Sequence, residues 1–218
     1  MLPKRFKERM SELLGDEYPK FEEALSLPGV RAVRVNGVKI STEQFLAKTA
    51  LDLSPISYAE DGFIPSDCEG IGRSAEHHSG MFYVQDPGAM ATVKSVEIKK
   101  GWRVLDACAA PGGKASQLAT AVGEDGFVLA NEYSPKRVKI IVSNFERLGI
   151  KNAMIVSLDT KKLSECSPAT LIWCFATRHA RARVCSENTT RQSPSGARKT
   201  CLPAQEDRRK FLKTAQKP

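Results

Sequence analysis

Apolar residues in the first 40 positions recur with two different periods. Over residues 6–14 and 18–25 they follow helical spacing, and a Pro-Gly pair ends the second run. Residues 31–40 (RAVRVNGVKI) alternate apolar and basic positions around an Asn-Gly turn, which indicates strands. Two helices followed by strands predict a small α+β segment at the start of the chain.

A helix and an unpatterned stretch come next. Ser41-x-x-Gln44 is a capping box, and the helix that it opens is expected to run through Leu51. Residues 54–80 contain Pro, Gly and polar residues with little periodicity, so we predict a loop or linker there. We therefore expect the α+β segment to occupy residues 1–75.

From Met81 onward, short apolar runs alternate with helical patterns. Strands separated by helices imply parallel βαβ units and an α/β fold, whose ligands bind beyond the carboxyl ends of the strands. The apolar run 171–175 is a candidate fourth strand of that sheet. The expected strands cover 81–84, 102–107, 127–131 and 153–157, and the expected helices cover 89–96, 115–122 and 135–148.

The turn after the strand at 102–107 is the most informative segment. Small residues and two glycines allow the backbone to approach a ligand, and the next helix presents unpaired N–H groups to it. The turn lacks the spacing of a P-loop or of a G-x-G-x-x-G dinucleotide site, and a tight connection without a ligand is the alternative. The candidate binding residues are Cys108, Ala109, Ala110, Pro111, Gly112, Gly113 and Lys114.

Two acidic residues follow the next two strands. Glu132 ends the second strand, where a carboxylate can accept hydrogen bonds from the hydroxyls of an adenosine ribose. Asp159 follows the third strand and could lie beside an adenine amino group. An acidic residue at either position alone is more often a solvated loop residue. Because Glu132 and Asp159 follow successive strands on the side of the glycine turn, we favour the interpretation that both contact the ligand of the turn.

Four stretches of the chain resemble the Nol/Nop/Sun RNA (cytosine-5) methyltransferases. They are DACAAPGGKASQLA at 106–119, YVQDPGAM at 83–90, NEYSPKR at 131–137 and VRAVRVNGVK at 30–39. The resemblance covers residues 1 to about 165 and includes bacterial enzymes that modify ribosomal RNA and related transfer-RNA enzymes. It implies a Rossmann-like methyltransferase sheet over 76–166, after an RNA-holding segment. It also implies that S-adenosyl-L-methionine binds to residues 108–114, Glu132, Arg137 and Asp159.

The catalytic groups of that family are missing from this sequence. In the family, one cysteine thiolate adds to C6 of cytosine so that C5 attacks the methyl group, and a second cysteine assists release. These groups come from a D-A-P-C-S-G segment and a later T-C segment; the first does not occur in this sequence, and the Thr-Cys pair at 200–201 has no such segment before it. Cys108 belongs to the cofactor turn and is no substitute. We therefore expect an incomplete sheet and no catalytic residue.

The net positive charge of the chain lies in its last segment. Of the 33 Lys and Arg residues 22 precede position 167, as do 22 of the 25 Asp and Glu, so residues 167–218 carry the whole net charge of +8. Residues 176–190 can be encoded by codons that, read from the third base, give DAPCSGEGMFRKYD. The same frame permits a strand upstream and helical spacing downstream. We infer an out-of-frame, largely unstructured basic tail, against the alternative of a genuine one.

Composition narrows the remaining classes. Six cysteines without a C-x-x-C pair and three histidines argue against a metal site. The start MLPKRFKERM lacks the apolar stretch of a signal peptide, and no run of about 18 apolar residues exists, so we expect a cytoplasmic protein without a membrane partner. The resemblance implies that the chain is a fragment of an S-adenosyl-L-methionine-dependent RNA (cytosine-5) methyltransferase, and we expect this fragment to be inactive. The alternatives are a non-catalytic RNA-binding adaptor and a small-molecule methyltransferase. The sequence does not indicate an oligomeric state.

Overall fold

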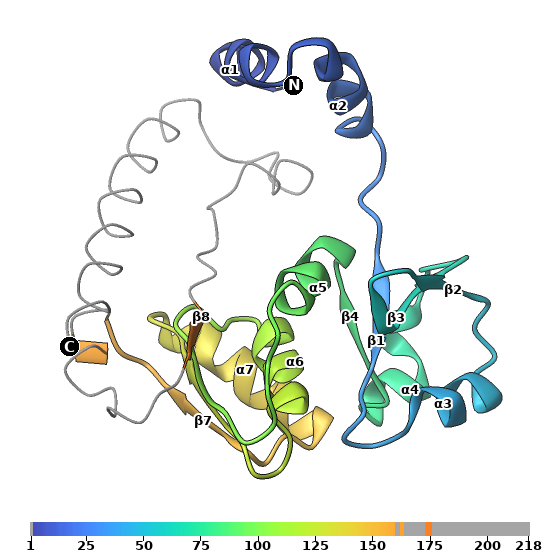
Figure 1. The fold of residues 1–218 in the computed structure, drawn as a ribbon. Coiled ribbons are helices and arrows are strands. Elements are labelled where there is room, and N and C mark those ends of the chain that lie inside the picture. Colours follow the sequence, from blue (N-terminus) through green and yellow to red (C-terminus); the bar gives the residue numbers. More distant parts are fainter. Residues whose placement is uncertain (1, 160–161, 164–172, 176–218) are drawn as a thin grey trace.

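The computed structural model describes residues 2–159, 162–163 and 173–175, and it contains two four-stranded sheets (Figure 1). The first sheet is antiparallel, and the second is parallel. The strands are β1 (Ala32–Val35), β2 (Leu53–Ile56), β3 (Ala59–Pro65), β4 (Phe82–Gln85), β5 (Arg103–Asp106), β6 (Phe127–Asn131), β7 (Ala153–Val156) and β8 (Trp173–Phe175). The helices are α1 (Lys4–Leu14), α2 (Tyr18–Ala24), α3 (Thr42–Lys48), α4 (Ala75–His78), α5 (Pro87–Lys94), α6 (Gly113–Val122) and α7 (Pro135–Leu148), with short 3-10 turns at Gly15–Glu17 and Ile71–Arg73.

The first two helices confirm the helical spacing in the sequence. Helices α1 and α2 lie apart from both sheets and join β1 through an extended segment (Figure 1). Phe6 and Phe21 bring the two helices together, with ring centroids 6.3 Å apart. Neither helix contains a buried residue, so their apolar side chains contribute little to the cores of the two sheets.

The antiparallel sheet has the order β2-β3-β1-β4 and carries the first core. Helix α3 packs Phe45 against Phe82 of β4, with ring centroids 5.9 Å apart. The predicted capping box is confirmed, because the Ser41 side chain accepts a hydrogen bond from the Gln44 amide at 3.2 Å. The helix ends at Lys48, one turn earlier than expected. The buried core residues include Val33, Val35, Ile40, Phe45, Phe63, Ile71 and Phe82.

The prediction of a loop over 54–80 is wrong. This stretch forms β2, β3 and the short helix α4, and β3 is hydrogen-bonded on both sides. The Pro and Gly residues made this stretch resemble a loop in the sequence. Pro55 is tolerated because β2 is an edge strand, and Gly62 is needed because a Cβ there would lie 2.9 Å from the Cβ of Ala59. Proline at an edge and glycine at a close approach are compatible with strands.

The expected pair of strands around Asn36-Gly37 is also corrected. Only β1 forms, and it pairs with β3 and β4 rather than with residues after the turn. All four residues of β1 are buried because the strand is central, and its polar side is covered by helix α6. The alternation of apolar and basic residues therefore does not mark a solvent-facing surface.

The parallel sheet confirms the predicted α/β fold. Its order is β7-β6-β5-β8, with all three pairings parallel. The candidate fourth strand is confirmed at Trp173–Phe175, which pairs with β5. Because β6 and β8 flank the first strand, the order reverses at β5, and in such sheets ligands bind outside the carboxyl ends at this point. Within the residues that the structure describes, a Rossmann-like sheet of four strands, incomplete at this length, follows an α+β N-terminal part.

The predicted boundaries at residues 75 and 166 compare with the structure as follows. Strand β4 lies beyond residue 75 but pairs with β1, so the strand pairing favours a boundary after Gln85, and the division at 75 stays a prediction. The predicted out-of-frame tail, residues 167–218, lies outside the described residues except for Trp173–Phe175.

Candidate functional site

The glycine turn lies at the carboxyl end of β5 and leads into helix α6. Gly112 is the N-cap of the helix and has a φ of 107°, a left-handed conformation that favours glycine. Its N–H donates to the Ala109 carbonyl at 2.7 Å, and its own carbonyl accepts from Ser116 at 2.8 Å. Gly113 is equally constrained, because a Cβ there would lie 2.9 Å from Cε1 of Tyr83. The turn is tight and mostly buried, although Pro111 is exposed, and the bond between Ala110 and Pro111 is cis.

Asp106 places a buried carboxylate at the base of this turn. Its Oδ1 accepts a hydrogen bond from the Cys108 amide at 3.2 Å, whereas Oδ2 has no partner among the described residues. Burial raises the pKa of Asp106 to about 7, against the opposing effects of the Cys108 N–H and the Lys114 charge. A fully buried carboxylate oxygen without a partner is costly, and a cationic ligand would offset that cost.

Asn131 joins the ends of three strands beside Asp106. Its side-chain amide donates to the carbonyls of Ala107 and Leu158, both at 3.1 Å, and its Oδ1 accepts from the Leu158 amide at 3.0 Å. Its own carbonyl accepts from Ala109 at 2.8 Å. The carboxyl ends of β5, β6 and β7 are therefore held in one fixed arrangement.

Glu132 and Arg137 connect the second strand to the turn. Glu132 is 5% exposed, and its Oε1 accepts from the Ser134 amide at 2.9 Å. Its Oε2 lies 2.9 Å from Nη1 of Arg137, whose Nη2 donates to the Ala110 carbonyl at 2.9 Å. The ion pair thus fixes the Glu132 carboxylate beside the glycine turn, with lone pairs remaining for a ligand.

Asp159 is the most weakly connected of the predicted residues. It is exposed, and its Oδ1 accepts from the Lys162 amide at 2.8 Å. Its neighbour Leu158 is bonded to Asn131, so the backbone before Asp159 lies at the same sheet edge as Asp106. Direct contacts link Ala110 of the turn, Arg137 and Glu132, whereas no contact between Asp159 and these residues is found in the described part of the chain.

Two residues of this region had no role in the sequence analysis. Asp106 was only the first residue of the turn, although an acid that closes an apolar strand is a usable signal. Arg34 is 3% exposed and donates to the Gly113 carbonyl at 2.7 Å. In the sequence it reads as a surface residue of an alternating strand, so no local signal could have identified it.

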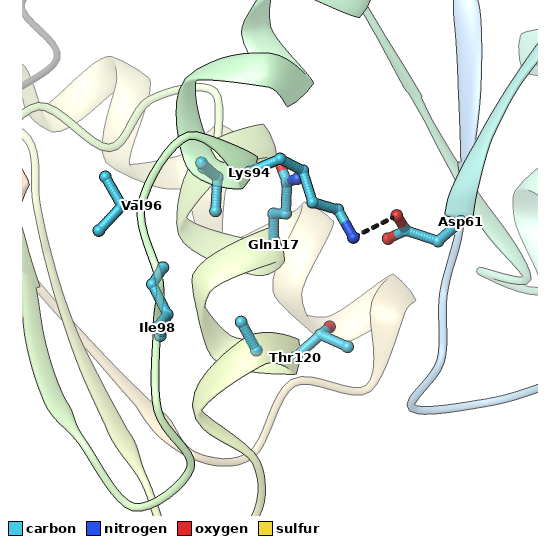
Figure 2. Close-up of a pocket in the computed structure, with 8 residues that line it drawn as sticks. Asp61, Lys94, Val96, Ile98, Gln117 and Thr120 are labelled. Atoms are coloured by element: carbon cyan, nitrogen blue, oxygen red, sulfur yellow. Dashed lines mark ion pairs between the residues drawn. The ribbon is translucent and has the colours of Figure 1, made fainter. Parts of the chain in front are cut away.

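A separate cleft lies along the other half of α6 (Figure 2). Its volume is about 310 Å³. Lys94 and Asp61 line it and form an ion pair, with Nζ of Lys94 2.9 Å from Oδ1 of Asp61. Its remaining lining is mainly apolar, with Gln117 and Thr120 from α6. Since α6 runs away from the carboxyl edge of the sheet, this cleft is distinct from the glycine turn.

The described part of the chain contains neither a metal-binding cluster nor a membrane-spanning helix. Within residues 2–159, 162–163 and 173–175, no cluster of three or more His, Cys, Asp or Glu side chains could hold a metal ion. None of the helices described is both long enough and apolar enough to cross a membrane.

The left-handed glycine of the turn gives a stability prediction. Gly112→Ala is expected to lower the free energy of unfolding by about 1–3 kcal/mol, because alanine is strained at this φ. The matched control is Gly72→Ala, where no atom lies within 4 Å of the added Cβ and φ is not positive; its effect should stay within about 0.5 kcal/mol. Urea unfolding of both variants measures the difference, and equal midpoints would contradict it.

Comparisons with known proteins agree with this geometry. Residues 2–87 match the N-terminal domain of 16S rRNA methyltransferase RsmF, and residues 93–173 match the family described as 16S rRNA methyltransferase RsmB/F. The ribosomal RNA small subunit methyltransferase F of Erwinia tasmaniensis is 36% identical over 187 residues, which cover 78% of this chain and 39% of that protein. The same enzyme of Cronobacter sakazakii is 37% identical over 178 residues, covering 77% and 37%.

A solved structure extends the agreement to the fold. A methyltransferase homologue from Pyrococcus horikoshii aligns with a TM-score of 0.69 and 29% identity, over 75% of this chain and 55% of that chain. The chain spans less than two fifths of the length of the curated relatives described above. Two family matches that together extend from residue 2 to residue 173 place the chain in the Nol/Nop/Sun family of RNA methyltransferases, in its RsmB/F branch.

Proposed function

We propose that this chain carries the cofactor-binding part of an S-adenosyl-L-methionine-dependent methyltransferase that acts on C5 of a cytosine in ribosomal RNA. The observation that carries the proposal is the glycine turn at the switch point of the sheet, with a buried, half-unpartnered Asp106 at its base. Membership in the RsmB/F branch supports ribosomal RNA as the substrate, with transfer RNA as the alternative.

The residues at this edge of the sheet fit the cofactor chemically. S-adenosyl-L-methionine is cationic at sulfur and supplies the methyl group. Asp106 offers it a buried negative charge, and Gly112 and Gly113 allow the tight turn because a Cβ at these positions would lie against Ile141, Phe145 and Tyr83. Glu132 is fixed by Arg137 where a ribose could reach its carboxylate. The proposed binding residues are Cys108 to Lys114, Glu132, Arg137 and Asp159.

The proposed division of labour follows the two sheets. Residues 1–75 form the segment that holds RNA, and strand β4 belongs with it because β4 pairs with β1. The rest of residues 76–166 binds the cofactor. Residues 167–218 are the out-of-frame tail. Because the sequence contains no D-A-P-C-S-G segment, the chain as written lacks a catalytic cysteine that the family needs and does not methylate RNA.

Cofactor binding tests the proposal directly. Glu132→Gln should weaken the binding of S-adenosyl-L-methionine by roughly 10-fold or more, because hydrogen bonds to a charged acceptor contribute about 1.5–3 kcal/mol. Glu124→Gln changes an exposed acid after α6 and serves as the matched control, with an unchanged dissociation constant. Calorimetric titration of the full chain measures both. Equal affinities of the two variants, or no binding by the unaltered chain, would overturn the proposal.

The adaptor alternative rests on the location of the charge. If the tail is genuine, its +8 would add nonspecific phosphate contacts. RNA binding would then fall steeply with salt and would be lost on deletion of residues 167–218. Salt-dependent RNA binding that survives this deletion favours the methyltransferase fragment instead.

A further inference from the structure

One short segment of the N-terminal sheet contacts both helices that carry the proposed cofactor residues. Arg34 lies on the central strand β1, and Asn36 and Lys39 follow within five residues. Helix α6 begins at the glycine turn, and helix α7 carries Arg137 in its first turn. The contacts of these three side chains cross from the N-terminal sheet to the methyltransferase sheet.

Arg34 holds the first turn of α6. Its Nη1 donates to the Gly113 carbonyl at 2.7 Å, and its Nη2 donates to Oγ of Ser116 at 2.8 Å. It also donates to the side chains of Gln85 and Gln117. Its guanidinium lies 5.6 Å from the centre of the Tyr83 ring, and that ring packs against Gly113. One arginine therefore fixes the backbone and a side chain immediately after the glycine turn.

The buried positive charge of Arg34 makes these hydrogen bonds costly to lose. The side chain is 3% exposed, and no carboxylate forms an ion pair with it among the residues that the structure describes. Burying an unpaired cation is expensive unless its donors are satisfied. Its donors meet neutral oxygens on α6 and β4, so displacement of α6 would remove the Gly113, Ser116 and Gln117 partners and leave the buried charge with Gln85 alone. This penalty opposes movement of the turn.

Asn36 and Lys39 hold the other helix at its last turn. The Asn36 side chain donates to the carbonyls of Leu148 and Gly80, both at 2.8 Å. Nζ of Lys39 donates to the carbonyls of Arg147 and Ser79, at 2.7 and 2.6 Å. The last carbonyls of α7, which lack partners within the helix, are thereby satisfied from the N-terminal sheet.

We propose that Arg34 is a positioning residue that sets the first turn of α6 and so the shape of the glycine turn, with Asn36 and Lys39 fixing α7 in the same way. The segment Arg34–Lys39 thereby couples the N-terminal sheet energetically to the cofactor site. This inference rests on the proposed function where it concerns cofactor affinity, but the contacts on α6 can be tested without a cofactor. By linkage, a ligand that shifts the N-terminal sheet would change cofactor affinity, and the reverse also holds.

A double-mutant cycle across the two sheets tests the coupling. In the full chain, Arg34→Gln should raise the dissociation constant of S-adenosyl-L-methionine at least 10-fold, and Ser116→Ala should raise it about 3-fold. The double variant should fall clearly short of the product of these factors, because both changes remove the same contact. Arg31→Gln, an exposed arginine beside the same strand, is the control and should stay within 2-fold. Additive effects, or an unchanged affinity in Arg34→Gln, would overturn the proposal.

Hydrogen exchange separates this inference from the proposed function. In Arg34→Gln, the amides of Ala115 to Leu118 at the start of α6 should lose protection, whereas those of β6 should not. An equal loss of amide protection in α6 and in β6 would mean that Arg34 has only a structural role, and it would overturn the inference. If the unaltered chain binds no cofactor, the proposed function fails, but this comparison still decides the role of Arg34. Ser116→Ala provides the same readout if Arg34→Gln does not fold.

Discussion

Replacing Asp106 with Asn should flatten the pH dependence of stability between about pH 4 and pH 7. The pKa of Asp106 in the folded protein is about 7, raised from 3.8 by burial. Between these values the folded state holds a proton that the unfolded state has released. The free energy of unfolding of the unaltered chain therefore falls as the pH rises through this window, and the loss is complete above pH 7.

The expected size of the effect is large. A shift of this magnitude corresponds to at most about 4 kcal/mol, at 1.36 kcal/mol for each pH unit. Asn keeps an oxygen that can accept from the Cys108 amide, so the backbone of the turn is preserved. The comparison is the change in unfolding free energy from pH 4.5 to pH 8 in each protein, measured with urea. Parallel changes in the two proteins would mean that Asp106 does not titrate in this window.

The same titration should appear in cofactor binding. A cationic ligand beside Asp106 favours the carboxylate, so the affinity for S-adenosyl-L-methionine should rise from pH 6 to pH 8 in the unaltered chain. In Asp106→Asn the affinity should be lower and nearly independent of pH. Asp125→Asn changes an exposed acid in the loop after α6 and is the matched control. A pH profile that survives in Asp106→Asn assigns the titration to another group.

The cofactor turn and the parallel sheet were predictable because their signals are local. An apolar strand, a glycine turn and a helix with Pro in its first turn follow one another between residues 102 and 148, and each boundary is marked by its own residues. Even the three residues of β8 were identified by their apolar character, although most of their surroundings in the chain lie outside the described residues.

The N-terminal sheet was harder to predict because its determinants are tertiary. Gly62 reads as a strand breaker until Met90 and Ala59 are seen against it. Arg34 reads as a solvated strand residue, yet it is buried because helix α6, some 80 residues later in the chain, supplies its partners. Local periodicity carries no information about contacts at such separations.

Restoring the alternative frame after residue 166 should create the catalytic activity that this chain lacks. Because the alternative frame also replaces residues 167–175, the strand that it permits there would take the place of β8 and lead into D-A-P-C-S-G at the switch point of the sheet, so that its thiolate lies near the cofactor turn. We expect transfer of labelled methyl groups to ribosomal RNA at a rate at least about 10³-fold above that of the 218-residue chain, whose rate should be at background. The control is the restored chain with the cysteine of that segment replaced by Ser, which should again be inactive. The restored chain and its Ser variant differ only in this one side chain, so only the thiolate can account for a difference in activity between these two proteins. Methyl transfer by the 218-residue chain, or gene codons that are incompatible with the alternative peptide, would disprove the loss of frame.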